Sequence, residues 1–169
     1  MTTIPFRTGH GFDAHRFGGS PPLRLAGVAV DSGRGLMSTS DGDAAAHAVI
    51  DAILGAAGKG DIGTHFPSSD PRWHDADSME MLRSVVGSVA SGGLAVSNLD
   101  LTIVAETVRV SPYRAEMRAR LAAVLGLGSE RVSVKATTTD GMGFAGRDEG
   151  VAVWASVLLI ESASSGGPA

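Results

Sequence analysis

The 169-residue chain contains no cysteine. Without cysteine it can form neither disulfide bonds nor thiolate zinc sites, so any transition-metal site must use histidine and carboxylate ligands. The histidines are therefore the first residues to consider as metal ligands. They are His10, His15, His47, His65 and His74.

The chain also lacks a long hydrophobic run and an excess of positive charge. No apolar segment approaches the roughly 18 residues that a membrane-spanning helix needs, and residues Met1–Arg7 show no signal-peptide core. The formal net charge is −4, whereas nucleic-acid-binding proteins usually carry a basic surface. We therefore expect no membrane and no nucleic-acid partner. The expected location is the bacterial cytoplasm or, as the alternative, the plastid stroma as a mature protein.

Length and composition favour one globular domain. Hydrophobic residues make up 43% of the chain, which suffices for a core in a domain of this length. We expect a single domain over residues 1–161. The small and polar segment Ser162–Ala169 is expected to be a disordered tail.

Residue periodicity predicts an alternation of strands and helices. Alternating small, polar and apolar residues predict strands at Phe6–His15, Leu23–Val30, Leu94–Ala105, Arg131–Thr137 and Gly150–Ile160. Apolar residues at helical spacing, with start and stop signals, predict helices at Asp43–Lys59, Ser78–Ala90 and Ser111–Leu125. Gly60 is expected to end the first helix, and Ser111 is the expected N-cap of the third.

The order of these elements favours a two-layer α+β domain with its helices on one face of the sheet. The segment Gly150–Ile160 is apolar on both faces of the predicted strand. A strand of this kind is covered on both faces, so we expect an oligomer in which sheets pack together.

The sequence Asp13-Ala14-His15 places a carboxylate and an imidazole on one side of a strand. Their backbones would lie about 6–7 Å apart, which suits two ligands of one metal ion. The alternative is a surface ion pair.

A second cluster follows on the first predicted helix. Asp43, His47 and Asp51 are four residues apart and line one helix face. Asp41 or Asp43 could simply cap this helix, which would leave His47 as an ordinary helical residue. As a ligand, His47 would complete a three-residue site with Asp13 and His15. Such a site leaves an open position, as in catalytic zinc centres, and a phosphate oxygen could fill it.

A glycine-rich loop, Thr137–Arg147, contains three threonines, Asp140 and an arginine. Hydroxyl groups, glycine amides and arginine bind phosphate, and a carboxylate can hold Mg²⁺. The alternative is a flexible hairpin loop. The segment Gly60–Pro71 is interpreted as a tight loop after the first helix.

Four motifs occur in one order along the chain: GHGFDAHRFG, SDGDAAAHAVIDAILGAAGKGDIGTHFPSSDP, ADS and VKATTTDGMGFAGRDEG. Over about Arg7 to Ile160 the chain resembles the 2-C-methyl-D-erythritol 2,4-cyclodiphosphate synthase family. The resemblance implies a homotrimer whose sheets pack about a threefold axis, with active sites between neighbouring subunits. It also implies a phosphorus–oxygen lyase of the non-mevalonate isoprenoid pathway, which cyclises a CDP-linked methylerythritol phosphate and releases CMP.

The same resemblance assigns roles to individual residues. Asp13, His15 and His47 would bind Zn²⁺, Asp140 a second divalent cation (Mg²⁺ or Mn²⁺), and Asp51 would lie beside His47. Thr138 and Thr39 would be the catalytic residues. The residues implied in substrate binding are Asp13, His15, Thr39, Ser40, Asp61, Ile62, Gly63, Phe66, Ser68, Asp70, Ala105, Arg109, Val110, Ser111, Ala136, Thr137, Thr138, Thr139, Asp140, Phe144 and Arg147.

The chain departs from the family pattern at four places. Thr39 replaces the usual histidine, Asp140 a glutamate, and Ser68 an acidic residue. Val108-Arg109 replaces the usual Pro-Lys pair, so Arg109 keeps the positive charge of the lysine but its side chain extends over a different distance. His65 lies near Ser68 in the sequence and could restore some of the lost polarity.

Two other functions use the same residues. Two histidines and one carboxylate also form the facial triad of non-haem Fe(II) oxygenases. The departures at Thr39 and Asp140 would also suit a binding homologue that has lost turnover. Zinc-supported release of CMP without oxygen distinguishes the synthase from both.

Overall fold

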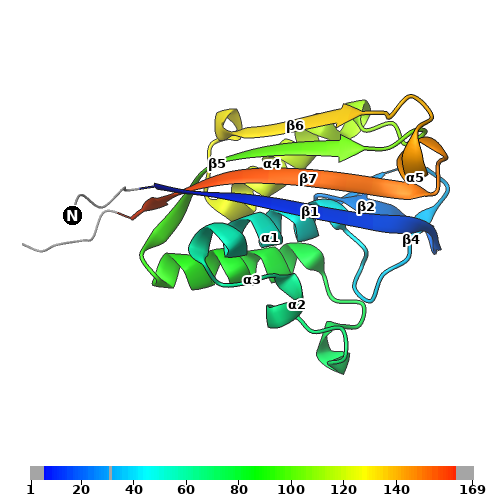
Figure 1. Cartoon of the computed structure of the whole chain (residues 1–169). Helices are drawn as coiled ribbons and strands as arrows, with labels where there is room; N and C mark the ends of the chain where they lie inside the picture. Colours follow the sequence, from blue (N-terminus) through cyan, green and yellow to red (C-terminus); the bar gives the residue numbers. More distant parts are fainter. Residues whose placement is uncertain (1–5, 31, 163–169) are drawn as a thin grey trace, which may run out of the picture.

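The computed structural model describes residues 6–30 and 32–162, and a mixed five-stranded sheet in the order β4-β1-β7-β5-β6 forms its centre (Figure 1). Its strands are β1 (Phe6–Gly19), β4 (Gly35–Leu36), β5 (Leu94–Val104), β6 (Val132–Thr137) and β7 (Gly150–Glu161). β7 runs antiparallel to both β1 and β5, whereas β5 and β6 are parallel. A parallel pair needs a crossover connection, and α4 (Arg114–Leu125) supplies it.

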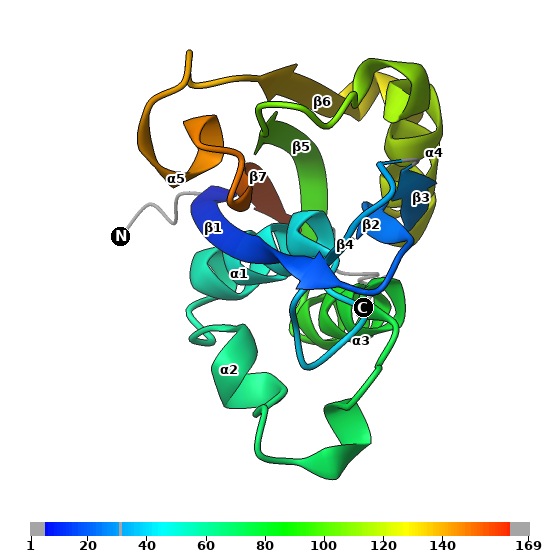
Figure 2. The same cartoon turned by 90° about the vertical axis from the view of Figure 1, so that its right-hand side faces the viewer.

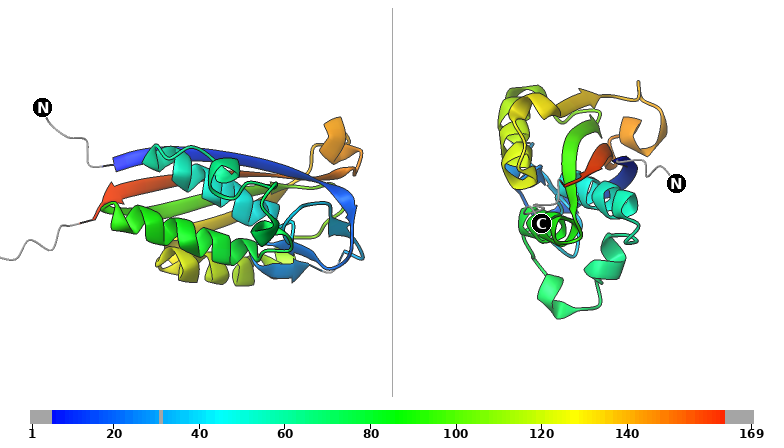
Figure 3. Two further views of the ribbon diagram at one scale, coloured as in Figure 1. Left: turned by 90° about the horizontal axis from the view of Figure 1, so that it is seen from below. Right: turned by 90° about the vertical axis from the view of Figure 1, so that its left-hand side faces the viewer.

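The three long helices form a second layer on one face of this sheet (Figures 2 and 3). α1 (Ala44–Ala57) packs on β1 and β7, α3 (Ser78–Ser91) lies beside α1, and α4 packs on β6. Val151, Val153 and Leu159 of β7 are fully buried, whereas Trp154 of the same strand is 39% exposed. The predicted two-layer α+β arrangement is confirmed.

α1 begins where the sequence predicted, at the buried N-cap residue Asp43. Its carboxylate accepts hydrogen bonds from the backbone N–H groups of Ala46 (3.0 Å), Ala26 (2.8 Å) and Gly27 (2.6 Å). Burial raises the pKa of Asp43, and these three donors act in the opposite direction. The residue therefore both caps α1 and ties it to the preceding hairpin.

Glycines on β1 let α1 lie close to the sheet. A Cβ atom at Gly11 would lie 2.0 Å from the carbonyl oxygen of Ala48, and one at Gly9 would lie 1.9 Å from that of Ala52. Any larger residue at these positions would push the helix away. This close packing brings His47 of α1 next to the side chains of β1.

Several predicted boundaries are wrong. α1 ends at Gly58, which adopts the left-handed conformation (φ 69°), and not at Gly60. The predicted third helix begins with a 3₁₀ turn, Ser111–Tyr113, and α4 starts at Arg114 without a side-chain cap, so Ser111 is not its N-cap.

Two segments predicted as single units are subdivided. Leu23–Val30 is a hairpin of β2 (Leu23–Leu25) and β3 (Val28–Val30), because Ala26 and Gly27 form a turn with φ values of 53° and 74°. The segment predicted as one loop after α1 contains α2 (Ile62–His65) and a 3₁₀ turn, Pro71–Trp73.

The glycine-rich loop and the chain end also differ from expectation. The loop contains the four-residue helix α5 (Gly143–Gly146). Ser162 of the expected tail donates a backbone hydrogen bond to Gly93 (2.8 Å), and positions 163–169 lie outside the described residues. Among the described helices, none has the length and apolar character needed to cross a membrane.

Candidate metal site and neighbouring pockets

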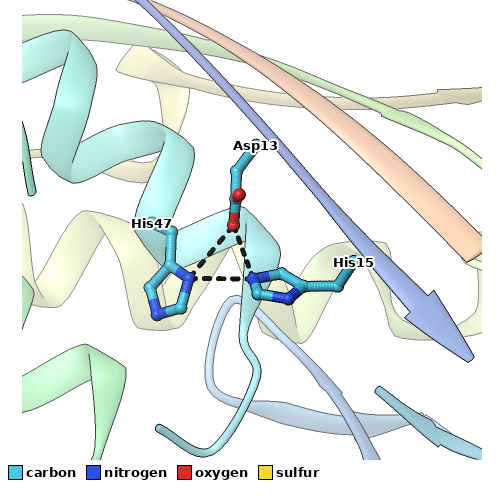
Figure 4. A group of neighbouring side chains, drawn as sticks. All are labelled: Asp13, His15 and His47. Atoms are coloured by element: carbon cyan, nitrogen blue, oxygen red, sulfur yellow. Dashed lines mark hydrogen bonds and ion pairs between the residues drawn. The ribbon is translucent and has the colours of Figure 1, made fainter. Parts of the chain in front are cut away.

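Asp13, His15 and His47 meet where β1 and α1 lie together (Figure 4). Asp13 Oδ2 lies 2.9 Å from His15 Nε2 and 3.0 Å from His47 Nδ1, and these two nitrogens are 3.2 Å apart. Two imidazoles and one carboxylate fit a tetrahedral metal with a free fourth position. Metal–ligand bonds of about 2.0–2.1 Å imply ligand atoms about 3.3 Å apart, close to the spacing found here.

The other nitrogen of each histidine is held by a group outside the triad. His15 Nδ1 lies 2.9 Å from the carbonyl oxygen of Met37 and donates to that oxygen, so in the neutral ring Nε2 is the nitrogen that is free to bind a metal. His47 Nε2 lies 2.9 Å from Ser78 Oγ, and Ser78 donates to Asp41 Oδ1 at 2.5 Å. Because the Ser78 hydroxyl donates its hydrogen bond to Asp41, its oxygen accepts a hydrogen bond from His47 Nε2. When both rings are neutral, as metal binding requires, each therefore points a lone pair at the centre of the triad.

The charges within the triad reinforce one another. Burial by itself would raise the pKa of Asp13, but hydrogen bonds from His15 and His47 outweigh burial and hold the pKa of this carboxyl well below its usual range. For His15, burial would lower the pKa, but the bond to Asp13 raises the pKa above its ordinary value. Without a bound metal, the site therefore favours a carboxylate–imidazolium pair.

Asp51 lies near enough to His47 for the imidazole to act on its carboxyl group, but no hydrogen bond joins these two side chains among the described residues. Asp51 Oδ1 accepts from the backbone N–H of Ile62 at 2.7 Å, while both His47 nitrogens already have other partners. Asp51 instead ties the start of α2 to α1. The residue that orients His47 is Ser78, which lies in the ADS motif and is fully buried.

A cavity of about 360 Å³ opens beside the triad. The residues predicted to bind substrate that line it are Asp13, His15, Thr39, Ser40, Ile62, Gly63, Phe66 and Ser68, and the sequence did not point to Ser38, Trp73 or Met81. Asp61 and Asp70 are not among the lining residues; they are N-caps that accept from Thr64 and Arg72. His65 is not among the lining residues, and its Nε2 lies 2.9 Å from the carbonyl oxygen of Lys59.

A second pocket lies between the segment that follows β5 and the end of β6. It is lined by the predicted residues Ala105, Arg109, Val110, Ser111, Ala136, Thr137 and Thr138, together with Glu106, Thr107, Val108 and Arg114. Thr139 and Asp140 lie just beyond it. Phe144 lines a separate hollow beside His15, and Arg147 donates to Glu149 (2.7 Å). The two main pockets share no residue.

Comparison with known proteins supports the resemblance seen in the motifs. The YgbB family model matches residues 6–160. A 2-C-methyl-D-erythritol 2,4-cyclodiphosphate synthase of Symbiobacterium thermophilum is 52% identical over 151 residues, which cover 89% of this chain and 96% of that relative.

Solved structures agree with this result. The bifunctional IspDF protein of Campylobacter jejuni superposes with a TM-score of 0.89 at 44% identity, over 92% of this chain and 42% of that one. A CDP-bound 2C-methyl-D-erythritol-2,4-cyclodiphosphate synthase has a TM-score of 0.83 at 35% identity, over 90% and 99% of the two chains. The chain therefore belongs to the YgbB family of 2-C-methyl-D-erythritol 2,4-cyclodiphosphate synthases.

Proposed function

We propose that the protein converts 4-diphosphocytidyl-2-C-methyl-D-erythritol 2-phosphate into 2-C-methyl-D-erythritol 2,4-cyclodiphosphate and CMP. The observation that carries this proposal is the Asp13–His15–His47 triad, whose lone pairs converge at the edge of an open cavity. In a member of this family, such a site suits a reaction at phosphorus. The enzyme is then a phosphorus–oxygen lyase of isoprenoid biosynthesis.

The nucleophile belongs to the substrate, since its 2-phosphate attacks the β-phosphorus and CMP leaves. The chain therefore has to position two phosphate groups and stabilise their charge. Asp13, His15 and His47 would hold Zn²⁺, which when bound supplies a Lewis acid for a phosphate oxygen. Ser38, Thr39 and Ser40 line the same cavity and offer hydroxyl groups to the methylerythritol phosphate.

The second pocket suits the nucleotide. Its wall combines backbone groups of an irregular segment with the hydroxyls of Thr137 and Thr138. Thr138 would stabilise charge in the transition state. Asp140 is exposed directly after these threonines and would hold Mg²⁺ or Mn²⁺ together with the diphosphate. A CDP-bound relative is consistent with this assignment.

A homotrimer would join the two pockets. Because they share no residue, one chain does not form a continuous site for a substrate that has both a nucleotide and a sugar-phosphate end. The sheet face opposite the three long helices exposes Trp154 and Phe12, whose ring centroids lie 4.6 Å apart with the ring planes tilted by 51°. We infer that these faces pack together around a threefold axis, with each active site between two subunits.

The decisive test is CMP release from the CDP-linked substrate by the zinc-loaded protein, compared with the His47→Ala variant. The wild-type protein should release CMP without oxygen, whereas His47→Ala should lose most bound zinc and most turnover. Substrate binding without CMP release would support the binding homologue instead. A requirement for Fe(II) and oxygen would support the oxygenase. Full zinc content and normal turnover in His47→Ala would refute the metal assignment.

A further inference from the structure

Arg34, which immediately precedes β4, joins two segments that are far away in the sequence. Its Nη1 donates to Asp148 Oδ2 at 2.8 Å, and its Nη2 donates to Thr107 Oγ1 at 2.5 Å. Thr107 Oγ1 in turn donates to Asp148 Oδ1 at 2.8 Å. The guanidinium also lies 3.8 Å above the ring of Phe17. These three polar side chains form a closed triangle.

The triangle fixes each of its members. The Thr107 hydroxyl accepts from Arg34 and donates to Asp148, so its orientation is determined. Arg34 donates through two nitrogens of its planar guanidinium group, and the contact with the Phe17 ring restricts the rotation of that group. Asp148 has a φ of 58°, a conformation that non-glycine residues rarely adopt. The hydrogen bond from Arg34 holds the pKa of Asp148 below its usual range, so the carboxylate is charged at neutral pH.

Of the three residues in this triangle, Thr107 is the one that lines the second pocket. The segment around it, between β5 and the 3₁₀ turn at Ser111, has no regular secondary structure. Its apolar side chains Val108 and Val110 are buried, whereas Thr107 itself is exposed and attached through its hydroxyl. The conformation of this pocket wall therefore depends on Arg34 and Asp148.

We propose that Arg34 and Asp148 act as positioning residues that hold Thr107, and with it segment 105–111, in the conformation that binds the CDP moiety. This inference rests on the proposed function, which assigns the nucleotide to the second pocket. Neither Arg34 nor Asp148 lines either of the two main pockets. They act on the nucleotide only through Thr107.

The test compares Arg34→Gln with the matched control Arg83→Gln. Arg83 is an exposed arginine of α3 that pairs with Glu80 at 3.3 Å, away from both pockets. In Arg34→Gln we expect the Kd for CDP and the KM for substrate to rise about tenfold, since charge-assisted bonds are lost. Zinc affinity and kcat should change by less than about twofold, because the metal triad is untouched. Arg34→Lys, which keeps the charge but not the fork, should recover part of the loss.

A second measurement needs no ligand. Amide hydrogen exchange in segment 105–111 should become faster in Arg34→Gln and in Asp148→Asn, and the double variant should be no worse than either single one. Unchanged exchange together with unchanged CDP affinity in Arg34→Gln would overturn the proposal. If exchange in segment 105–111 became faster in Arg34→Gln but the wild-type protein bound no CDP, the positioning role of Arg34 would be supported. The assignment of the nucleotide to the second pocket would then be wrong.

Discussion

At the scale of single residues, the site depends on which nitrogen of each histidine is free. His15 Nδ1 is hydrogen-bonded to a backbone carbonyl, and His47 Nε2 is hydrogen-bonded to Ser78, whose hydroxyl donates to Asp41. In the neutral rings these partners therefore select the tautomers that can bind a metal. Groups of this kind orient the metal ligands and contribute to metal affinity.

Replacing Ser78 with Ala should therefore weaken zinc binding about 10–100-fold without removing a ligand. The loss arises because His47 Nε2 loses its shorter, fully buried hydrogen bond to Ser78 and keeps only Ser40 Oγ, at 3.1 Å, as a partner. Chelator competition measures the affinity. Ser84→Ala, an exposed serine on the same helix, is the control and should bind zinc normally. Equal zinc affinity in both variants would show that Ser78 does not orient the ring.

The triad should also make the metal-free protein sensitive to pH. The pKa of His15 is raised above 6.5 and the pKa of Asp13 is lowered below 3.8. The pair therefore contributes fully to stability between these values. Its contribution falls as pH rises through the raised pKa of His15, and it falls in acid as pH drops through the lowered pKa of Asp13.

Urea unfolding of the metal-free protein between about pH 5 and pH 9 tests this expectation. Stability should decline toward the alkaline end in the wild type, and His15→Gln should lack that decline. Zinc affinity should change in the opposite sense and increase as pH rises, because the metal competes with the proton on His15. A wild-type stability curve identical in shape to that of His15→Gln would contradict the assigned pKa shift.

At the scale of elements, the site exists because α1 lies against the glycines of β1. His47 comes from the helix, whereas Asp13 and His15 come from the strand, so the separation of the two elements sets the spacing of the ligands. A Cβ atom at position 11 would meet the backbone of α1 at Ala48. Backbone atoms do not move aside as the end of a side chain can.

Gly11→Ala should accordingly destabilise the fold by about 1–3 kcal/mol, the usual cost of overpacking, and should weaken zinc binding as well. Gly55→Ala is the matched control, because a Cβ atom there meets nothing within 4 Å. It lies within α1 and should stabilise the helix by up to about 1 kcal/mol. Urea denaturation and chelator competition report the two effects. Unaltered stability in Gly11→Ala would mean that the contact between β1 and α1 is looser than described.

At the scale of the whole molecule, the described residues cover the sheet face opposite α1, α3 and α4 only in part, where Ala145 of α5 packs on Val104 and Ala152. Trp154 is 39% exposed and Phe12 is 46% exposed on this face. Exposed aromatic groups of this size, next to each other, are typical of protein–protein contacts. The proposed trimer would bury them and complete the active sites in the same step.

Light scattering should give a mass near three chains for the wild-type protein. Trp154→Arg should lower that mass, because a charge would enter the apolar contact, and CMP release should fall with it. Ser84→Arg places the same charge on the helical layer and should leave the mass unchanged. A wild-type protein that is monomeric at micromolar concentration would exclude an active site shared between subunits.

Motifs and periodicity were sufficient for the family, the fold class, the helix start at Asp43 and the members of the triad. Each of these depends on residue types at short spacing, which local sequence records directly. The same reasoning did not predict the hydrogen bond that Asp51 makes. Four-residue spacing places Asp51 on the helix face of His47, but it does not say that a backbone amide of α2 will bind the carboxylate first.

Only the tertiary structure decided how distant segments meet. Ser78 and His47 are hydrogen-bonded although they lie 31 residues apart in the sequence, and Arg34 and Asp148 are paired although they lie 114 residues apart. Contacts at such separations follow from the packing of α1 and α3 and from the pairing of β1 with β4 and β7, which no local pattern encodes. The sequence by itself therefore determined the three residues of the triad. The packing of the elements decided which atoms of the triad face one another and which residues contact segment 105–111.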